Sequence, residues 1–503
     1  MILMCRRFLF ALFIHCTIFL GSAWAATEAS STRGRFDCGG ILEEDVWSLW
    51  EGGKHSEARG SLDHRLGMRS DVYVLYDLQT RYHNLYLMSV RCNRVSRQHQ
   101  FASLIERAYG YLEINQSVLG KGAGWICRGG ALCSQRSDLA NRELVLVSSQ
   151  FLGFATDIAA GYSANEIASD IRVRSFVERT VEVTLEHLLR WSGPREEADL
   201  LRRIEMDAAQ VSTKGSERLL TDKHVWQLVA YLNLAGALKK MPWSRSYLGL
   251  SISERDQLKK YLESLLILFS KRLTIEVVGD GLYRVRINID HGFWTNRNEN
   301  RYAGYEGTMS PHPCVDDNRH ESNQAKGGKR PLPILRRDVG WDFSHSRRFV
   351  HLSQSMDKYG DLISDIWGVS SQALLAKQLS NGLVTQLIDK IWNGDKGYPL
   401  FSNYWNGVNG WYRVAYTNRP GNCQEGIPPY GFSEVFATGG YIIWSTHSEL
   451  IRMLGIQIMR LTESTDYSDR DFVFHYYPSL HSMSDPRIRS DRQLMFWPNL
   501  IGH

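Results

Sequence analysis

Segments with a helical spacing of apolar residues follow one another through the first half of the chain, and this pattern limits the possible folds more than any other feature. Within residues 70–92, Val74, Leu78, Tyr82 and Leu85 recur at near-helical intervals. Similar patterns occupy 100–114, 140–162, 168–191, 221–241 and 253–273, the last opening with a Ser-x-x-Asp capping signal. Strands and helices do not alternate, which argues against a doubly wound sheet.

The texture of the sequence changes after about residue 272. Residues 273–289 alternate apolar and polar side chains around Gly279-Asp280-Gly281, which predicts either a hairpin or a helix end followed by an extended segment. Residues 310–331 are polar and rich in Gly and Pro, as in a long surface loop. Helical patterns return at 343–359, 370–392 and 433–461, the last beginning at Ser433 as its cap.

Many helices joined by elaborate loops predict a mostly α protein, specifically an α/α toroid with long functional loops and little β structure. In a toroid, paired helices form an incomplete barrel and the loops at one end form a cleft. An irregular helical array of the TPR kind is the alternative, but the helices differ in length and no repeat of fixed period is present.

The N-terminus has the layout of a secretory signal peptide. Arg6 and Arg7 precede an apolar run from Phe8 to Leu20, and Ala23-Trp24-Ala25 forms a small-x-small cleavage pattern. We expect cleavage near Ala25 and a secreted or periplasmic protein that is not an integral membrane protein. The predicted organisation is a signal peptide (1–25), an N-terminal segment (26–70), an α/α-toroid catalytic or binding domain (71–465) and a C-terminal extension (466–503).

Six cysteines remain after removal of the signal peptide, an even number that indicates disulfides in an oxidising compartment. Cys127 and Cys133 flank a short glycine-containing loop and form the best pair. The pairs Cys38–Cys92 and Cys314–Cys423 would complete the set, although six cysteines allow fifteen pairings.

Charge and motif content exclude several classes of function. The net charge of +5 is small for 503 residues, and no long Lys/Arg block indicates a nucleic-acid-binding protein. Carboxylate and histidine side chains occur in the later half of the chain, but none has the tight spacing of a zinc motif, so we predict no metal and no cofactor. The candidate metal ligands are His291, Asp342, His345, His351 and His447.

Three late segments combine aromatic, amide and guanidinium side chains: 290–308, 336–351 and 401–416, the last followed by 426–440. Rings stack on the apolar faces of sugars, while amides and guanidinium groups bond to hydroxyls and carboxylates. The segments therefore predict a polysaccharide groove, although the same rings are equally expected of a packed core. The predicted substrate-binding residues are Trp294, Tyr302, Trp341, Trp405, Asn406, Trp411, Tyr412, Arg413 and Tyr430.

A helical, exported chain with Asn, His, Tyr and Arg in its late loops resembles the α/α-toroid polysaccharide lyases, the group of alginate lyases and heparinase-type catalytic domains. The resemblance is one of pattern over about residues 70–465, and no diagnostic family string is present. It implies β-elimination on an acidic, uronate-containing polysaccharide, with those four residue types in the active site.

The chemistry of β-elimination assigns the roles. An Asn, Gln or Arg neutralises the carboxylate beside the C5 proton, a His or Tyr removes that proton, and a Tyr can protonate the leaving oxygen. The best matches are Asn298 or Asn406 as neutraliser, His345 as base, Tyr404 or Tyr412 as acid or base, and Arg348 as carboxylate clamp. The predicted catalytic set is Asn298, His345, Tyr404 and Arg348, so that Tyr404→Phe and His345→Ala should each reduce turnover.

Two other functions fit the same features. A glycoside hydrolase needs two carboxylates across the scissile bond, for which Asp342 and Glu434 are the best pair. A periplasmic polysaccharide-binding or assembly protein would show the same aromatic and arginine residues without a proton-transfer pair.

Overall fold

The computed structural model describes residues 34–117, 120–135, 139–206, 220–279, 284–291, 302–307, 336, 338–370, 373–414, 416–419, 422–424 and 426–503. The described chain is mostly helical with little strand, as predicted. The signal peptide, most of 290–301 and the loop 310–331 lie outside the described residues, and the predictions made for them stay predictions.

The helices match most of the predicted segments. In chain order they are α2 (Ile41–Leu49), α3 (His55–Ser61), α4 (Tyr73–Arg91), α5 (Val95–Tyr109), α6 (Gly130–Gln135), α7 (Val145–Gly161), α8 (Ala164–Ser169), α9 (Ile171–Trp191), α10 (Pro194–Glu205), α11 (Asp222–Lys240), α12 (Arg245–Leu248), α13 (Ile252–Lys271), α14 (Phe343–Ser346), α15 (Arg348–Tyr359), α16 (Leu362–Trp367), α17 (Ala373–Gln386), α18 (Ser433–Thr438), α19 (Glu449–Glu463), α20 (Tyr467–Tyr476) and α21 (Pro486–Phe496). Short π-helical or 3₁₀ segments join several of them: η1 (Trp50–Lys54), η2 (Leu62–Met68), η7 (Leu387–Ile391), η8 (Tyr441–Thr446), η9 (Pro478–Leu480) and η10 (Trp497–Leu500).

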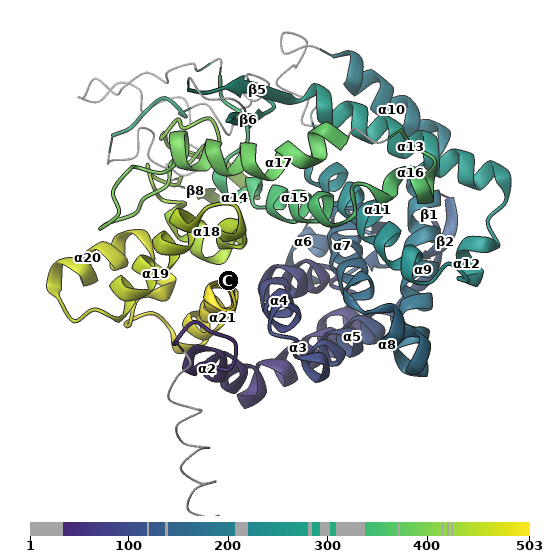
Figure 1. The fold of residues 1–503 in the computed structure, drawn as a ribbon, viewed down its shortest axis with the longest axis horizontal. Helices are drawn as coiled ribbons and strands as arrows, with labels where there is room; N and C mark the ends of the chain where they lie inside the picture. The colour runs from purple at the N-terminus through teal and green to yellow at the C-terminus, as the bar shows by residue number, and fades with distance from the viewer. Residues whose placement is uncertain are drawn as a thin grey trace, which may run out of the picture.

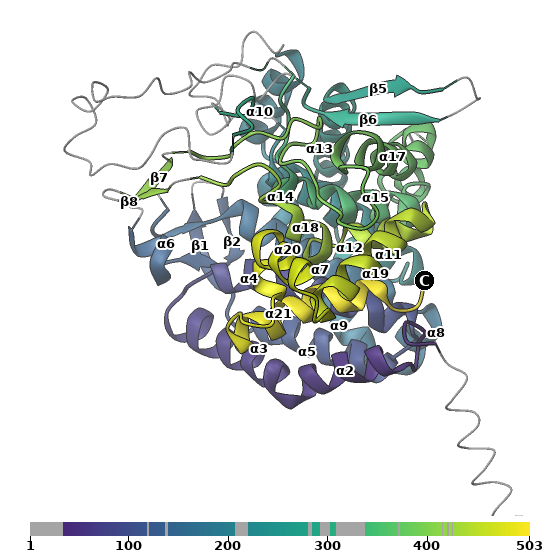
Figure 2. The ribbon, with the colours of Figure 1, turned by 90° about the vertical axis from the view of Figure 1, so that its left-hand side faces the viewer.

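Within the described residues the strands form four separate antiparallel pairs: β1 (Glu113–Ser117) with β2 (Gly120–Gly124), β3 (Ile126–Cys127) with β4 (Arg142–Glu143), β5 (Leu273–Val277) with β6 (Val285–Ile289), and β7 (Tyr416–Arg419) with β8 (Asn422–Gln424). The pair β5–β6 is the hairpin alternative predicted for 273–289. The pairs β1–β2 and β7–β8 lie at the side of the molecule opposite the C-terminus (Figure 2).

Helix packing follows the chain order. α4 packs against α7, α7 against α11, and α11 against α15, while α21 packs back against α4. Figure 1 shows α4, α7, α11 and α15 towards the middle of the molecule, with α5, α9, α13 and α17 farther out. One hydrophobic cluster runs through these helices, from Leu42 to Ile501.

Two helix predictions were wrong in detail. The segment 433–461 is three helical pieces, α18, η8 and α19, because Gly440 has a φ of +90°, which breaks the first junction. Helix α13 is capped by Ser251 in a capping box with Glu254, two residues before the expected cap. The hydroxyl of Ser433, the expected cap of α18, instead accepts a hydrogen bond from the backbone N–H of Phe401 (3.0 Å).

Two of the predicted disulfides are confirmed. Cys38–Cys92 and Cys127–Cys133 are bonded, with Cα–Cα distances of 5.3 and 5.5 Å. Cys314 lies outside the described residues, so its pairing with Cys423 stays a prediction.

The C-terminus packs against the first of these disulfides. Gly502 donates its N–H to the carbonyl of Phe36 (3.0 Å), and a Cβ at Gly502 would lie 2.7 Å from Sγ of Cys38 and 3.1 Å from Sγ of Cys92. Arg91, at the end of α4, donates from Nε to the carbonyl of Ile501 (3.1 Å). Both ends of the described chain are therefore fastened to the C-terminal end of α4.

Candidate functional site

The three segments predicted to form the site do meet, as far as they are described. The N–H of Trp405 donates to the carbonyl of Trp341 (2.8 Å), and the N–H of Trp411 donates to the carbonyl of Tyr305 (3.1 Å). Each bond joins two segments that are distant in the sequence, so 302–307, 341–351 and 401–416 form one region.

A His–Asp pair lies in this region, at the start of α14. Asp342 caps the helix by accepting a hydrogen bond from the N–H of His345 (3.1 Å). The same carboxylate contacts Nδ1 of His345 at 2.7 and 2.9 Å and accepts from the hydroxyl of Ser344 (2.5 Å). This spacing, Asp-x-x-His at a helix start, holds the imidazole by its Nδ1. Among the described residues Nε2 has no hydrogen-bond partner, so it is available to a ligand.

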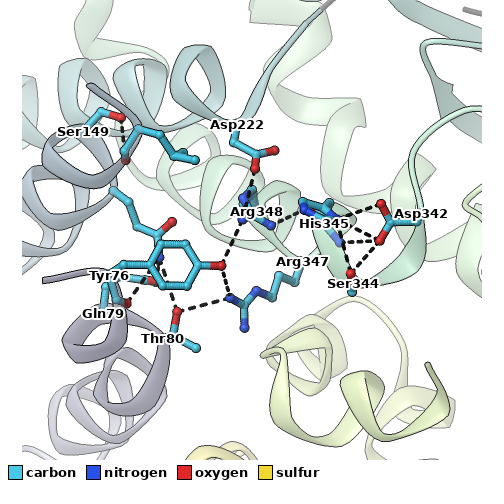
Figure 3. Close-up of polar contacts among 12 residues, drawn as sticks. Tyr76, Gln79, Thr80, Ser149, Asp222, Asp342, Ser344, His345, Arg347 and Arg348 are labelled. Carbon is cyan, nitrogen blue, oxygen red and sulfur yellow. Dashed lines mark hydrogen bonds and ion pairs between the residues drawn. The ribbon is translucent and has the colours of Figure 1, made fainter. Parts of the chain in front are cut away.

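Two successive arginines follow and converge on one tyrosine hydroxyl (Figure 3). Nη2 of Arg347 lies 3.1 Å and Nη2 of Arg348 lies 3.2 Å from the hydroxyl oxygen of Tyr76, which is in the first turns of α4. Arg347 also donates to the hydroxyl of Thr80 (3.1 Å), and Arg348 forms an ion pair with Asp222 at the start of α11 (3.1 Å). Helices α4, α11, α14 and α15 thus contribute to one polar cluster.

This arrangement moves the pKa values of the acid and base groups in opposite directions. Burial alone would raise the pKa of Tyr76, but the positive charges of Arg348, Arg347 and His345 outweigh it and lower that pKa from 10 to about 8. Burial would lower the pKa of His345, but Asp342 outweighs it and raises that pKa above its ordinary value. Burial likewise opposes ionisation of Asp342, yet the charge and hydrogen bond of His345 hold its pKa well below the usual range.

A cavity of about 520 Å³ opens on the His345 side of this cluster. Its lining includes Ser344, His345, Tyr412 and Arg413. The side chain of His345 is 27% exposed, whereas that of Arg348 is 3% exposed. A ligand in the cavity therefore contacts the imidazole directly. Arg348 is buried and bonds to the hydroxyl of Tyr76 instead.

The predicted aromatic lining is largely core. Trp341, Tyr404 and Trp405 are completely buried, and their polar atoms are used internally: the indole of Trp341 donates to Asp290 (2.9 Å) and that of Trp405 to the carbonyl of Ile287 (3.2 Å). The prediction that Trp341 and Trp405 stack on a sugar is wrong for this structure, because neither ring face is accessible. Tyr404, which was predicted to be a catalytic acid or base, is equally inaccessible. The cause is that large rings near glycines also serve to fill the interior beneath a loop.

The remaining predicted binding residues lie in several different environments. Tyr302 and Trp411 are 5% exposed and pack together in a small cluster of their own, apart from the main core. Asn406 donates to the carbonyl of Asp338 (2.9 Å) and accepts from the N–H of Val408 (3.2 Å), which is a loop-holding role. Of the predicted binding residues, Tyr412 and Arg413 line the cavity, Tyr430 is half-buried outside the lining, and Trp294 lies outside the described residues, as does catalytic candidate Asn298.

The structure changes the expected result for Tyr404→Phe. The hydroxyl of Tyr404 donates to the buried carbonyl of Trp411 (3.1 Å). Removing it should lower the free energy of unfolding by about 1–3 kcal/mol, because that acceptor loses a partner away from water, and should leave the rate constant of turnover nearly unchanged. Denaturant unfolding and a turnover assay on the same preparation measure both. A large loss of turnover with unchanged stability would restore the catalytic role.

The candidate metal ligands do not converge. His351 stacks on His83 with ring centroids 4.2 Å apart, His447 lies 3.3 Å from Asp357, and His291 bonds to Asn288 (3.0 Å). Among the described residues, one group of potential ligands lies close together, Cys38, Glu43 and Cys92, and its two sulfur atoms are already joined in a disulfide.

Sequence reasoning missed Tyr76, Asp222 and the function of Arg347. Tyr76 lies in a segment whose apolar spacing identifies it only as a helix, and Asp222 follows an ordinary helix cap position. The doublet Arg347-Arg348 directly after Asp342-x-x-His345 was the available signal, since two adjacent cations, of which the fold buries Arg348, require an acceptor close to them.

Comparisons with known proteins add no assignment: no family model, curated protein or solved structure matches the chain. None of the described helices combines the length and the apolar character that a membrane-spanning helix needs.

Proposed function

We propose that the protein cleaves an acidic, uronate-containing polysaccharide by β-elimination. The observation that carries this proposal is the hydroxyl of Tyr76, held 3.1 and 3.2 Å from two guanidinium groups and with its pKa lowered to about 8. At pH 8 about half of such a phenol is ionised, so a large fraction of the protein carries a phenolate that can accept a proton from the substrate.

The cluster supplies each group that the elimination requires. The Tyr76 phenolate takes the proton from C5, and the electron pair of that C–H bond forms the C4–C5 double bond as the C4–O bond breaks. Nε2 of His345, whose imidazolium form Asp342 favours, gives its proton to the departing oxygen. Arg347 is partly exposed and supplies positive charge for the uronate carboxylate, so that the enolate-like intermediate is stabilised.

These roles differ from those predicted from the sequence. The base becomes Tyr76 in place of His345, because the pKa of the phenol is lowered while that of the imidazole is raised. Arg348 is a positioning residue that holds Tyr76 from a buried place, paired with Asp222. The carboxylate-neutralising role was predicted for Asn298 or Asn406. Asn298 lies outside the described residues and Asn406 bonds to the backbone, so the proposal gives this role to Arg347.

The fold and the location of the protein belong to the same proposal. The neighbour order α4, α7, α11, α15 with outer helices beyond them supports an α/α toroid. The two disulfides and the N-terminal pattern of residues 1–25 support export, to a secreted or periplasmic location.

Glycoside hydrolysis has less support. Asp342 is 1% exposed and fully occupied with His345 and Ser344, and Glu434 accepts from the N–H of Ser479 (3.0 Å). A hydrolase needs one protonated and one ionised carboxyl group facing the substrate, whereas both of these carboxylates are held by the fold.

A panel of acidic polysaccharides, incubated with the purified protein at pH 8, tests the proposal. A rise in ultraviolet absorbance from unsaturated ends is the expected result. New reducing ends without absorbance would assign hydrolysis, and binding without either product would assign a non-catalytic polysaccharide-binding protein. Both of the latter results contradict the lyase proposal.

A further inference from the structure

A second cavity, of about 790 Å³, lies next to the polar cluster but outside it. It is bordered by β4, the end of α9, α10, α13 and the start of α11. The two sites adjoin at α11: Asp222 pairs with Arg348, and the following residue, Lys223, lines the second cavity.

Basic side chains outnumber acidic ones in the lining of this cavity, which includes Arg142, Arg195, Arg202, Arg203 and Lys223 together with Glu143, Glu196 and Asp199. Arg142 and Arg195 are exposed, and neither forms an ion pair within the part of the chain that the structure describes. Asp199 is already shared by Arg202 and Arg203, at 3.0 and 2.7 Å. A planar guanidinium group without a carboxylate partner is suited to bind one from a ligand.

The interior holds a donor and an acceptor that lack partners. Trp191 is 1% exposed, and its indole N–H makes no hydrogen bond to any described residue. Oε1 of Glu143 is buried and also makes none to a described residue; it lies 3.5 Å from Nε2 of His187, while Oε2 accepts from Arg190 (2.9 Å). Unpaired buried polar atoms are costly, and a hydroxyl group is the ligand atom that can accept from one and donate to the other.

We propose that this cavity is a second binding site, for a sugar acid: its carboxylate binds Arg142 and Arg195, and its hydroxyl groups bind Trp191 and Glu143. The choice of a uronate as the acid rests on the proposed function, whereas the carboxylate and hydroxyl chemistry rests on the cavity alone. The bound unit is either a free uronate or a distant unit of the chain being cleaved, because the two sites are neighbours.

The indole ¹⁵N–¹H resonance of Trp191, identified by its absence from a Trp191→Phe variant, reports on this cavity and on no other site. The full-length protein carrying Tyr76→Phe, which should not consume the ligand, is titrated with galacturonate, with a short oligogalacturonate and with neutral galactose. We expect a saturable shift with the acids and little with galactose. A shift with the oligomer alone assigns the cavity to the polymer chain, and a shift with the monomer as well assigns it to free uronate.

Replacement of both rim arginines (Arg142→Ala with Arg195→Ala) should weaken binding by about tenfold or more, since two charge-assisted contacts are lost. Arg487→Ala, an exposed arginine on α21, is the matched control and should leave affinity unchanged. An unmoved Trp191 resonance, equal affinity for galactose, or unchanged affinity in the double variant would overturn the inference. These binding measurements do not depend on turnover. The second site can therefore be confirmed even if the protein is not a lyase, and it can be excluded even if the protein is one.

Discussion

The Tyr76→Phe variant should lose about 10²–10⁴-fold in the rate constant of turnover, the contribution typical of a positioned acid or base. The substitution removes the proton acceptor and keeps the ring, so helix α4 and the packing around it should be preserved. Unsaturated-end absorbance at pH 8 gives the rate, and circular dichroism together with thermal unfolding shows whether the fold is retained.

Tyr73→Phe is the matched control for this experiment. Tyr73 lies on the same helix with its ring centroid 6.5 Å from that of Tyr76, whereas the hydroxyl that accepts from both Arg347 and Arg348 is that of Tyr76. It should turn over substrate at nearly the wild-type rate. Equal rates for the wild type and the Tyr76→Phe variant would exclude Tyr76 as the base.

The pH profile distinguishes a base from a merely structural tyrosine. The wild-type rate should rise with pH through about 8, as the phenolate forms. Arg347→Gln removes one of the charges that lower this pKa, so the rising limb should move to higher pH. If Tyr76 had only a packing role, the rising limb of the pH profile would be at the same pH in Arg347→Gln as in the wild type.

The Asp342→Asn variant should show the second largest effect. Asparagine can still cap α14, but the charge that raises the pKa of His345 is gone, so the imidazolium is lost at lower pH. Each unit by which that pKa falls removes about tenfold of the protonated form on the alkaline side. Because the His345 charge also lowers the pKa of Tyr76, the phenolate becomes scarcer as well. Turnover at pH 8 should therefore fall, and the alkaline limb should move to lower pH.

Stability should change with pH in a defined window. The pKa of Asp342 is lowered in the folded state, so its contribution is present above its unfolded value of about 4 and is lost as pH falls through the folded value. The pKa of His345 is raised, so its contribution is complete below about 6.5 and is lost as pH rises through the folded value. The stability difference between wild type and Asp342→Asn should be largest between about pH 4 and 6.5.

Asp357→Asn is the control, because Asp357 lies 3.3 Å from His447 in a second carboxylate–histidine pair outside the site, and the exposure of His447 (25%) is close to that of His345 (27%). It should leave the pH profile of turnover unchanged. An unaltered profile in Asp342→Asn would contradict the role given to His345.

Periodicity was sufficient to predict helices α4, α7, α9 and α11, because each has an apolar face long enough to be recognised. It could not predict the break at Gly440, since glycine within an apolar run indicates either a break or close packing. The late polar segments were also predicted to meet, and they do.

The site was only half predictable. Asp342, His345 and Arg348 carry their chemistry in one short segment, so a local pattern reveals them. Tyr76 becomes reactive only because α4 is placed beside the start of α15, more than 270 residues later in the chain, and no local pattern contains that contact. For Trp341 and Trp405 the local pattern predicted too much, since it assigned binding to rings that are buried. Aromatic residues in a loop segment indicate a binding surface only if the fold leaves their ring faces in solvent.

The fastening of both chain ends to α4 has a consequence for how the reactive tyrosine is held in place. Arg91 and Cys92 lie some fifteen positions beyond Tyr76, which at 1.5 Å per residue is roughly 22 Å along the helix axis. Ile501 and Gly502 therefore hold the C-terminal end of α4, the helix whose N-terminal turns carry Tyr76. Because α4 is a continuous helix, the contacts of Ile501 and Gly502 at its C-terminal end help to fix the position of the Tyr76 hydroxyl without touching it.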